Sequence, residues 1–142
     1  MHDAMQPPLF FLQRFYLSFR RSPMARYVDG FIVAIPTKNV EAYRKLARKA
    51  GKVWMEYGAL EYVECIADDV KPGKLTSFPQ SVKLKADETV AFSWIVYKSR
   101  KHRDTINKKV MADPRIASMD PKTMPFDGKR MIFGGFKSIV EL

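Results

Sequence analysis

The sequence predicts an α+β protein, a ferredoxin-like β-α-β-β-α-β domain with a four-stranded antiparallel sheet and two helices on one face. Two observations lead to this prediction. Four strand-like runs alternate with two helix-like stretches in that order, and the runs are apolar on both faces. A strand with one face in water alternates apolar and polar residues, so these strands are expected to be covered on both sides. Because two helices cover one face only, a second copy of the sheet is the simplest cover for the other, which predicts a homodimer.

The first half of the domain is expected to be a strand, a helix and a second strand. The strand covers residues 26–35, Pro36 ends it, and Thr37 or Asn39 caps the helix that follows. Apolar residues repeat with helical spacing from residue 40 to residue 57, and Gly58 stands where the helix ends. The expected apolar face of this helix holds Tyr43, Leu46, Ala47, Ala50, Trp54 and Tyr57. The second strand is expected at residues 59–67.

The second half begins with a long connection. Residues 70–88 exceed a tight hairpin and carry Pro and Gly turn signals, so we expect an insertion, and one interpretation is an arm across a dimer interface. A third strand is expected at residues 89–98. Ser99 then caps a helix to about residue 112, with a thin stripe of His102, Ile106 and Val110. Asp113-Pro114 ends this helix, and the last strand is expected at residues 130–140.

Residues 24–142 are expected to form a single domain, and residues 1–23 differ from it. Their apolar stretch covers about 11 residues, short of the roughly 20 that a membrane-spanning helix needs. No basic region precedes the stretch and no small-residue cleavage site follows it, as a secretory signal would require. We expect an N-terminal extension that is loose or has a misassigned start, and no membrane partner.

Charge and cysteine content limit the classes of function. A single Cys65 excludes an intramolecular disulfide, and one Cys with two His is too few for a Cys/His zinc site. A reduced, cytoplasmic setting without metal or cofactor is therefore expected, with Cys65 packed in the core. The net charge of +10 lies mostly on the helices, where it favours solubility or, as an alternative, attraction of RNA or anions.

In a ferredoxin-like sheet the strands lie in the order 4-1-3-2, and one edge gathers groups that are distant in sequence. The start of the second helix meets the end of the first helix and the starts of two strands there. The gathered side chains are His102, Trp54, Glu56, Tyr57, Asp29, Glu61 and Tyr97. The candidates for catalysis are His102, Asp29 and Glu61, because a histidine paired with a carboxylate can move a proton. The candidates for ligand binding are Trp54, Tyr57, Tyr97 and Trp94. The alternative to catalysis is a structural role for His102. No nucleotide-binding or metal-binding motif appears in the sequence.

Three carboxylates interrupt strands that are otherwise apolar, namely Asp29, Glu61 and Glu64. Burying an unpaired carboxylate is costly. We expect these groups to lie exposed at strand ends, to line a polar cavity, or to pair across strands with Arg26, Arg130 or Lys137.

Six blocks occur in order along the chain: YVDGF at 27–31, GALEYVE at 58–64, FPQS at 78–81, FSWIVYKSR at 92–100, MDP at 119–121 and MPFDGKRM at 124–131. Together they resemble a family of small bacterial proteins, the domain of unknown function family 1428 (YbaA-like), over residues 24–142. The resemblance implies the dimeric α+β barrel superfamily, in which two ferredoxin-like sheets face each other. That architecture hosts cofactor-free monooxygenases, haem enzymes and non-enzymatic modules, and the family brings no established catalytic residues.

We therefore expect a dimeric α+β barrel protein that binds a small anionic or aromatic ligand in a pocket between sheet and helices. One alternative is a cofactor-free oxygenase or isomerase that uses His102 with a carboxylate. Another is an RNA-associated basic protein.

Overall fold

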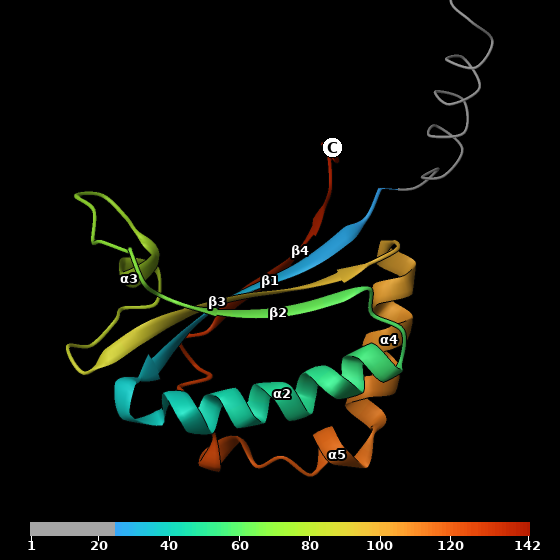
Figure 1. Cartoon of the computed structure of the whole chain (residues 1–142), viewed down its shortest axis with the longest axis horizontal. Coiled ribbons are helices and arrows are strands. Elements are labelled where there is room, and N and C mark those ends of the chain that lie inside the picture. Colours follow the sequence, from blue (N-terminus) through green and yellow to red (C-terminus); the bar gives the residue numbers. More distant parts are fainter. Residues whose placement is uncertain (1–24) are drawn as a thin grey trace, which may run out of the picture.

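The computed structural model describes residues 25–142, which form one sheet with helices packed on it (Figure 1). The strands are β1 Tyr27–Pro36, β2 Glu61–Ile66, β3 Glu88–Tyr97 and β4 Ile132–Lys137. The helices are α2 Val40–Glu56, α3 Phe78–Ser81, α4 Arg100–Ala112 and α5 Pro114–Ala117, with 3-10 turns η1 Thr37–Asn39 and η2 Pro121–Thr123. The prediction for residues 1–23 lies outside the described residues.

The sheet confirms the predicted fold class. Its strand order is β2-β3-β1-β4, and every neighbouring pair is antiparallel. The register places Asp29 of β1 between Ile95 of β3 and Gly135 of β4. Side chains alternate between the two faces of a strand, so the odd-numbered residues of β1, such as Asp29 and Phe31, share one face. That face packs against the helices, because Val33 and Ile35 form a core cluster with residues of α2.

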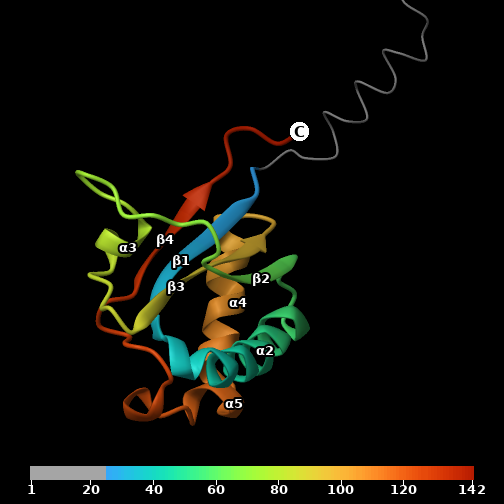
Figure 2. The same cartoon turned by 60° about the vertical axis from the view of Figure 1, so that its left-hand side comes forward.

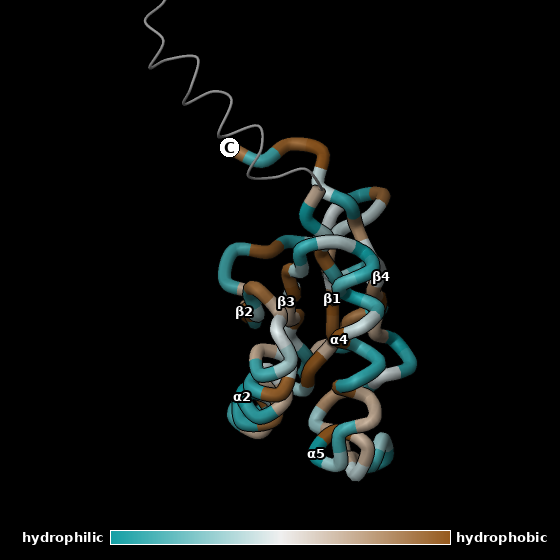
Figure 3. Tube along the Cα trace, turned by 90° about the vertical axis from the view of Figure 1, so that its right-hand side faces the viewer, coloured by the Kyte–Doolittle hydropathy of each residue, from teal (hydrophilic) through white to brown (hydrophobic). Residues whose placement is uncertain are grey.

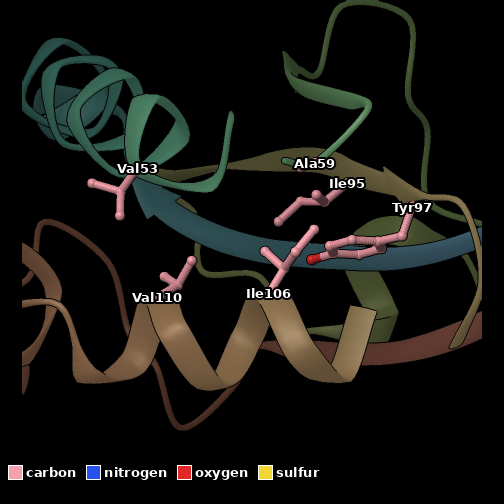
Figure 4. Packing of buried hydrophobic residues seen from close by; sticks show 6 residues of the cluster. All are labelled: Val53, Ala59, Ile95, Tyr97, Ile106 and Val110. Atoms are coloured by element: carbon pink, nitrogen blue, oxygen red, sulfur yellow. The ribbon is translucent and has the colours of Figure 1, made fainter. Parts of the chain in front are cut away.

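α2 and α4 both cover this helix-facing side of the sheet, and α4 runs across the direction of α2 (Figure 1). Between the two helices and β3 lies a core of Val53, Ala59, Ile95, Tyr97, Ile106 and Val110, shown in Figure 4. Val53 is only 1% exposed although the predicted apolar face of this helix omitted it. Leu46, Ala50 and Trp54 belong to the predicted face but are only partly buried, because they border a cavity.

Local signals fix the ends of the helices. Gly58 adopts a φ of +109° after α2, a left-handed conformation that favours glycine. Ser99 caps α4 as predicted, since its hydroxyl accepts a hydrogen bond from the amide of His102. The predicted cap before α2 is wrong. Asn39 occupies the cap position but makes no capping bond, and its Nδ2 donates to the carbonyl of Pro125.

The opposite side of the sheet, here called the open face, is covered at its ends. The insertion carries α3 onto this face, away from α2 (Figure 2), where Val82 packs on Ala34 and Val90. At the other end of the face, Glu141 forms an ion pair with Arg26. The exposed residues between these ends include Cys65, Phe92, Ile132 and Phe136. The prediction that Cys65 packs in the core is therefore wrong for a single chain.

Polar and apolar residues lie on different parts of the fold. In Figure 3 the strands are largely hydrophobic, and the outer side of α2 is hydrophilic. Among residues 25–142, no helix combines the length and apolar character needed to cross a membrane.

Candidate functional site

A cavity of about 420 Å³ lies between the helix-facing side of the sheet and the helices. Its floor consists of the inward residues of the two central strands, including Phe31, Val33 and Ser93. Leu46 and Ala50 of α2 line it from the helix side. Because α4 crosses the direction of α2, the two helices do not pack along their whole lengths, and the cavity occupies the space between them.

Methionines gather around the cavity. They come from α4 and from the chain that leads to β4, and they are Met111, Met119, Met124 and Met131. Phe126 joins them and packs edge-on against Tyr43. Methionine side chains are flexible and polarizable, so a wall of this kind adapts to ligands of different shape.

The first polar group of the cavity is Asp29, which pairs with Arg103. The Nη1 of Arg103 donates to Oδ1 of Asp29 at 2.9 Å, and Asp29 is almost fully buried. Asn107 Nδ2 lies 3.5 Å from the other carboxylate oxygen. The Oδ1 of Asn107 accepts from Trp54 Nε1 at 3.0 Å and from the Tyr97 hydroxyl at 3.2 Å, which fixes the orientation of the amide. Burial raises the pKa of Asp29 above its ordinary value, and Arg103 opposes this effect only in part.

The second polar group is Glu64 of β2, held by two tyrosines. The Tyr43 hydroxyl donates to Oε2 at 2.6 Å, and the Tyr62 hydroxyl donates to Oε1 at 3.0 Å. Burial raises the pKa of both tyrosines, and the negative charge of Glu64 raises it further. Both hydroxyls therefore stay protonated and act as donors. Gly51 of α2 permits this arrangement, because a Cβ there would lie 2.7 Å from the ring of Tyr62.

His102 bonds to neither Asp29, Glu56 nor Glu61 within the described residues, and it is not among the residues that line the cavity. Its Nδ1 accepts a hydrogen bond from the backbone amide of Lys98 at 3.0 Å, and its ring lies edge-on to Tyr97. Burial lowers the pKa of His102, which favours the neutral ring that this bond requires. The arrangement closes the turn between β3 and α4.

The other predicted residues fall into three places. Trp54 and Asp29 line the cavity, and Tyr97 reaches the same network through Asn107. Tyr57 donates instead to Asp113 at 2.8 Å, at the end of α4. Glu56 pairs there with Arg115, which lowers the pKa of Glu56. Glu61 lies on the open face, and Trp94, whose Nε1 donates to Glu61 at 3.1 Å, also belongs to the residues that line the cavity.

For the three strand carboxylates, the alternative of cross-strand pairs with Arg26, Arg130 or Lys137 is wrong. Arg130 pairs with Glu88 and Asp127, and Arg26 pairs with Glu141. Two of the carboxylates, Asp29 and Glu64, instead line the cavity. Among residues 25–142, no cluster of His, Cys, Asp and Glu is placed to hold a metal ion.

Sequence reasoning missed Arg103 and Asn107. Neither residue is among the candidates that the sequence indicates. A signal was present, because these residues are four apart and so lie on one stripe of α4, beside the core stripe of Ile106 and Val110. No sequence pattern indicates the contact of the Tyr62 hydroxyl with Glu64, because this contact depends on the close approach of α2.

The chain is similar to proteins whose descriptions name no activity. The sequence profile of the family described as "Protein of unknown function (DUF1428)" matches residues 26–128. The "Uncharacterized protein YbaA" of Escherichia coli K12 is 52% identical over 116 residues, 82% of this chain and 98% of that protein. The YbaA of Shigella flexneri matches with the same values. Among solved structures, an uncharacterized NIPSNAP domain protein from Burkholderia xenovorans aligns with a TM-score of 0.46 and 14% identity, over 78% of this chain and 91% of that one.

Proposed function

We propose, from the premise that this chain belongs to the protein family of unknown function DUF1428, that it binds a small and mainly apolar molecule in the cavity between its sheet and helices. The observation that carries the proposal is the composition of this cavity. Its volume of about 420 Å³ falls within the roughly 300–1,000 Å³ of small-molecule sites. Apolar walls with two hydrogen-bonded polar groups, around Asp29 and around Glu64, are the usual composition of such a site.

The enzyme alternative has less support. A general base must reach the reacting proton directly or through one water. His102 lies outside the cavity lining, and its Nδ1 is already bonded to the amide of Lys98. Replacing His102 by Gln is therefore expected to leave ligand binding intact.

The RNA alternative would depend on the exposed basic face of α2, with Arg44, Arg48 and Lys49. It predicts RNA binding that weakens steeply with salt and is lost when these three residues are replaced together. The described residues give this face no aromatic partner for base stacking, since the aromatic side chains of α2 point toward the sheet.

The test of the proposed function fills the cavity from α2. Ala50 lines the cavity and Ala42 is exposed on the same helix, so Ala50→Leu and Ala42→Leu form a matched pair. Binding of Nile red, a neutral fluorescent probe, is measured by titration. We expect Ala50→Leu to weaken binding about tenfold or more and Ala42→Leu to leave it unchanged, because the new methyl groups occupy ligand volume. Equal binding by both variants, or no binding by the unaltered protein, would contradict the proposal.

We also propose that two copies associate through the open face. Phe92, Ile132 and Phe136 are 43%, 42% and 63% exposed on this face, and the rings of Phe92 and Trp94 lie 5.5 Å apart. A contiguous exposed apolar surface is typical of an interaction site.

A cytoplasmic setting suits the exposed thiol of Cys65, because reducing compartments keep thiols free.

The dimer is tested by sedimentation of two charge variants. Phe136→Glu places a charge on the open face, whereas Met55→Glu places one on an exposed part of α2. We expect the first variant to be a monomer and the second to sediment as the unaltered dimer. A monomeric unaltered protein would refute the association.

A further inference from the structure

We propose that the molecule bound in this cavity carries a hydrogen-bond-donating end, an amine or a hydroxyl group, and that Glu64 holds that end. The inference rests on the proposed function, because it assigns a ligand class to the same cavity. It is carried by the balance of hydrogen-bond donors and acceptors in the cavity wall, and by the charges that face it.

The main donors of the cavity wall each donate to a protein acceptor. The hydroxyls of Tyr43 and Tyr62 both donate to Glu64. Trp54 Nε1 donates to Asn107. Arg103 directs its guanidinium to Asp29, Asp104 and Tyr27. A ligand that offers only acceptors is left with the Ser93 hydroxyl and the remaining N–H groups of Asn107 and Arg103, or has to displace one of these bonds.

Acceptor capacity remains at Glu64. Each of its two carboxylate oxygens receives one tyrosine hydroxyl, whereas an ionised carboxylate has about four acceptor positions. None of the ion pairs formed within residues 25–142 includes Glu64. The second carboxylate, Asp29, is paired with Arg103 and so has less capacity left.

The charges of the wall favour the same ligand. Asp29 and Glu64 contribute two negative charges and Arg103 contributes one positive charge, so the wall is negative although the chain carries +10. An anion would therefore meet repulsion where an amine meets attraction. Arg44, Arg48 and Lys52 line a separate groove between α2 and β2 that also borders Glu64, but their side chains are exposed and screened by water and salt.

The geometry around Glu64 is rigid enough to select one end of a ligand. Tyr43 is buried and packs against Phe126, and Tyr62 lies beneath Gly51 and beside Trp54. The two hydroxyls therefore hold the carboxylate from both sides. Preorganised groups of this kind gain affinity, because no side chain has to be ordered on binding.

The test uses three probes with one skeleton, phenylbutylamine, phenylbutanol and phenylbutanoate, measured by calorimetric titration of the intact protein. We expect the amine and the alcohol to bind about tenfold or more tighter than the carboxylate. Glu64→Gln should weaken binding of the amine more than binding of the alcohol, because it removes the negative charge. Glu61→Gln is the matched control, because Glu61 lies on the same strand but on the open face, and it should change nothing.

The outcomes separate this inference from the proposed function. Binding of all three probes with equal affinity, or tightest binding of the carboxylate, would overturn the inference while the proposed function stands if Ala50→Leu still weakens each probe. No binding of any probe would contradict both. If Glu64→Gln fails to fold, the order of the three affinities on the unaltered protein still decides.

Discussion

The ion pair between Arg103 and Asp29 makes a prediction about stability and its dependence on pH. We expect Arg103→Met to destabilise the protein because it leaves the buried carboxylate of Asp29 without its cation. At the observed separation of 2.9 Å, two unit charges interact by about 1.4 kcal/mol in water and by about 6 kcal/mol at an effective dielectric of about 20. The Arg103 side chain is 20% exposed and that of Asp29 is 7% exposed, so we expect a loss of about 3 kcal/mol near pH 8.

The sign of the pH dependence follows from Asp29. Burial already raises its pKa above the ordinary value of 3.8, and removal of Arg103 raises it further. A group whose folded pKa is raised stabilises the fold fully below its unfolded pKa, and this contribution is lost as the pH rises through the folded pKa. The variant should therefore recover part of its stability as the pH falls from 8 toward 5, because Asp29 takes up a proton.

The assay is urea denaturation at several pH values. Arg44→Met is the matched control, because it breaks an exposed pair with Glu41, worth about 0.5 kcal/mol or less. The double variant Asp29→Asn with Arg103→Met should regain at least half of the loss at pH 8. The reasoning is refuted if Arg103→Met costs no more than Arg44→Met, or if its deficit is the same at every pH.

Other predictions concern packing and backbone conformation. Gly51→Ala should lower the free energy of unfolding by about 1–3 kcal/mol in urea titrations, because the new Cβ would meet the ring of Tyr62. This loss should outweigh alanine's better helix propensity, and a neutral or stabilising effect would contradict the described packing. Gly58→Ala should lower the melting temperature, because alanine is strained at a φ of +109°; an unchanged value would show that this turn rearranges. Ile106→Ala should cost about 2–5 kcal/mol, whereas Met111→Ala, at an exposed position of the same helix, should cost far less; similar losses would argue against the described core.

Much of the fold could be predicted because its signals are local or periodic. Gly58, Ser99 and Asp113 mark the helix ends found in the structure, and the order of elements leads directly to the sheet topology. Which strand face meets the helices could not be predicted, because both faces are apolar. The packing of Val33 and Ile35 on α2 identifies the helix-facing side, where Asp29 lies next to Ile95 and opposite α4.

The candidate site was predicted only in part, for a physical reason. Sequence placed Asp29, Trp54 and Tyr97 at one sheet edge, and the structure joins all three through Asn107. His102 shares their region but not their cavity, because its side chain turns back to the amide of Lys98. Side chains one helical position apart point in different directions, and only the packing of α4 on β3 shows which of them reach the cavity.

The two central strands, β1 and β3, limit which amino-acid substitutions the chain tolerates. On one side their residues shape the cavity and core, as Phe31 and Ser93 do, and on the other they form the open face, as Ile32 and Phe92 do. Nearly every position along them is constrained from one side or the other. Tolerated substitutions should therefore concentrate on the outer surface of α2, at positions such as Lys45, where a side chain meets only water.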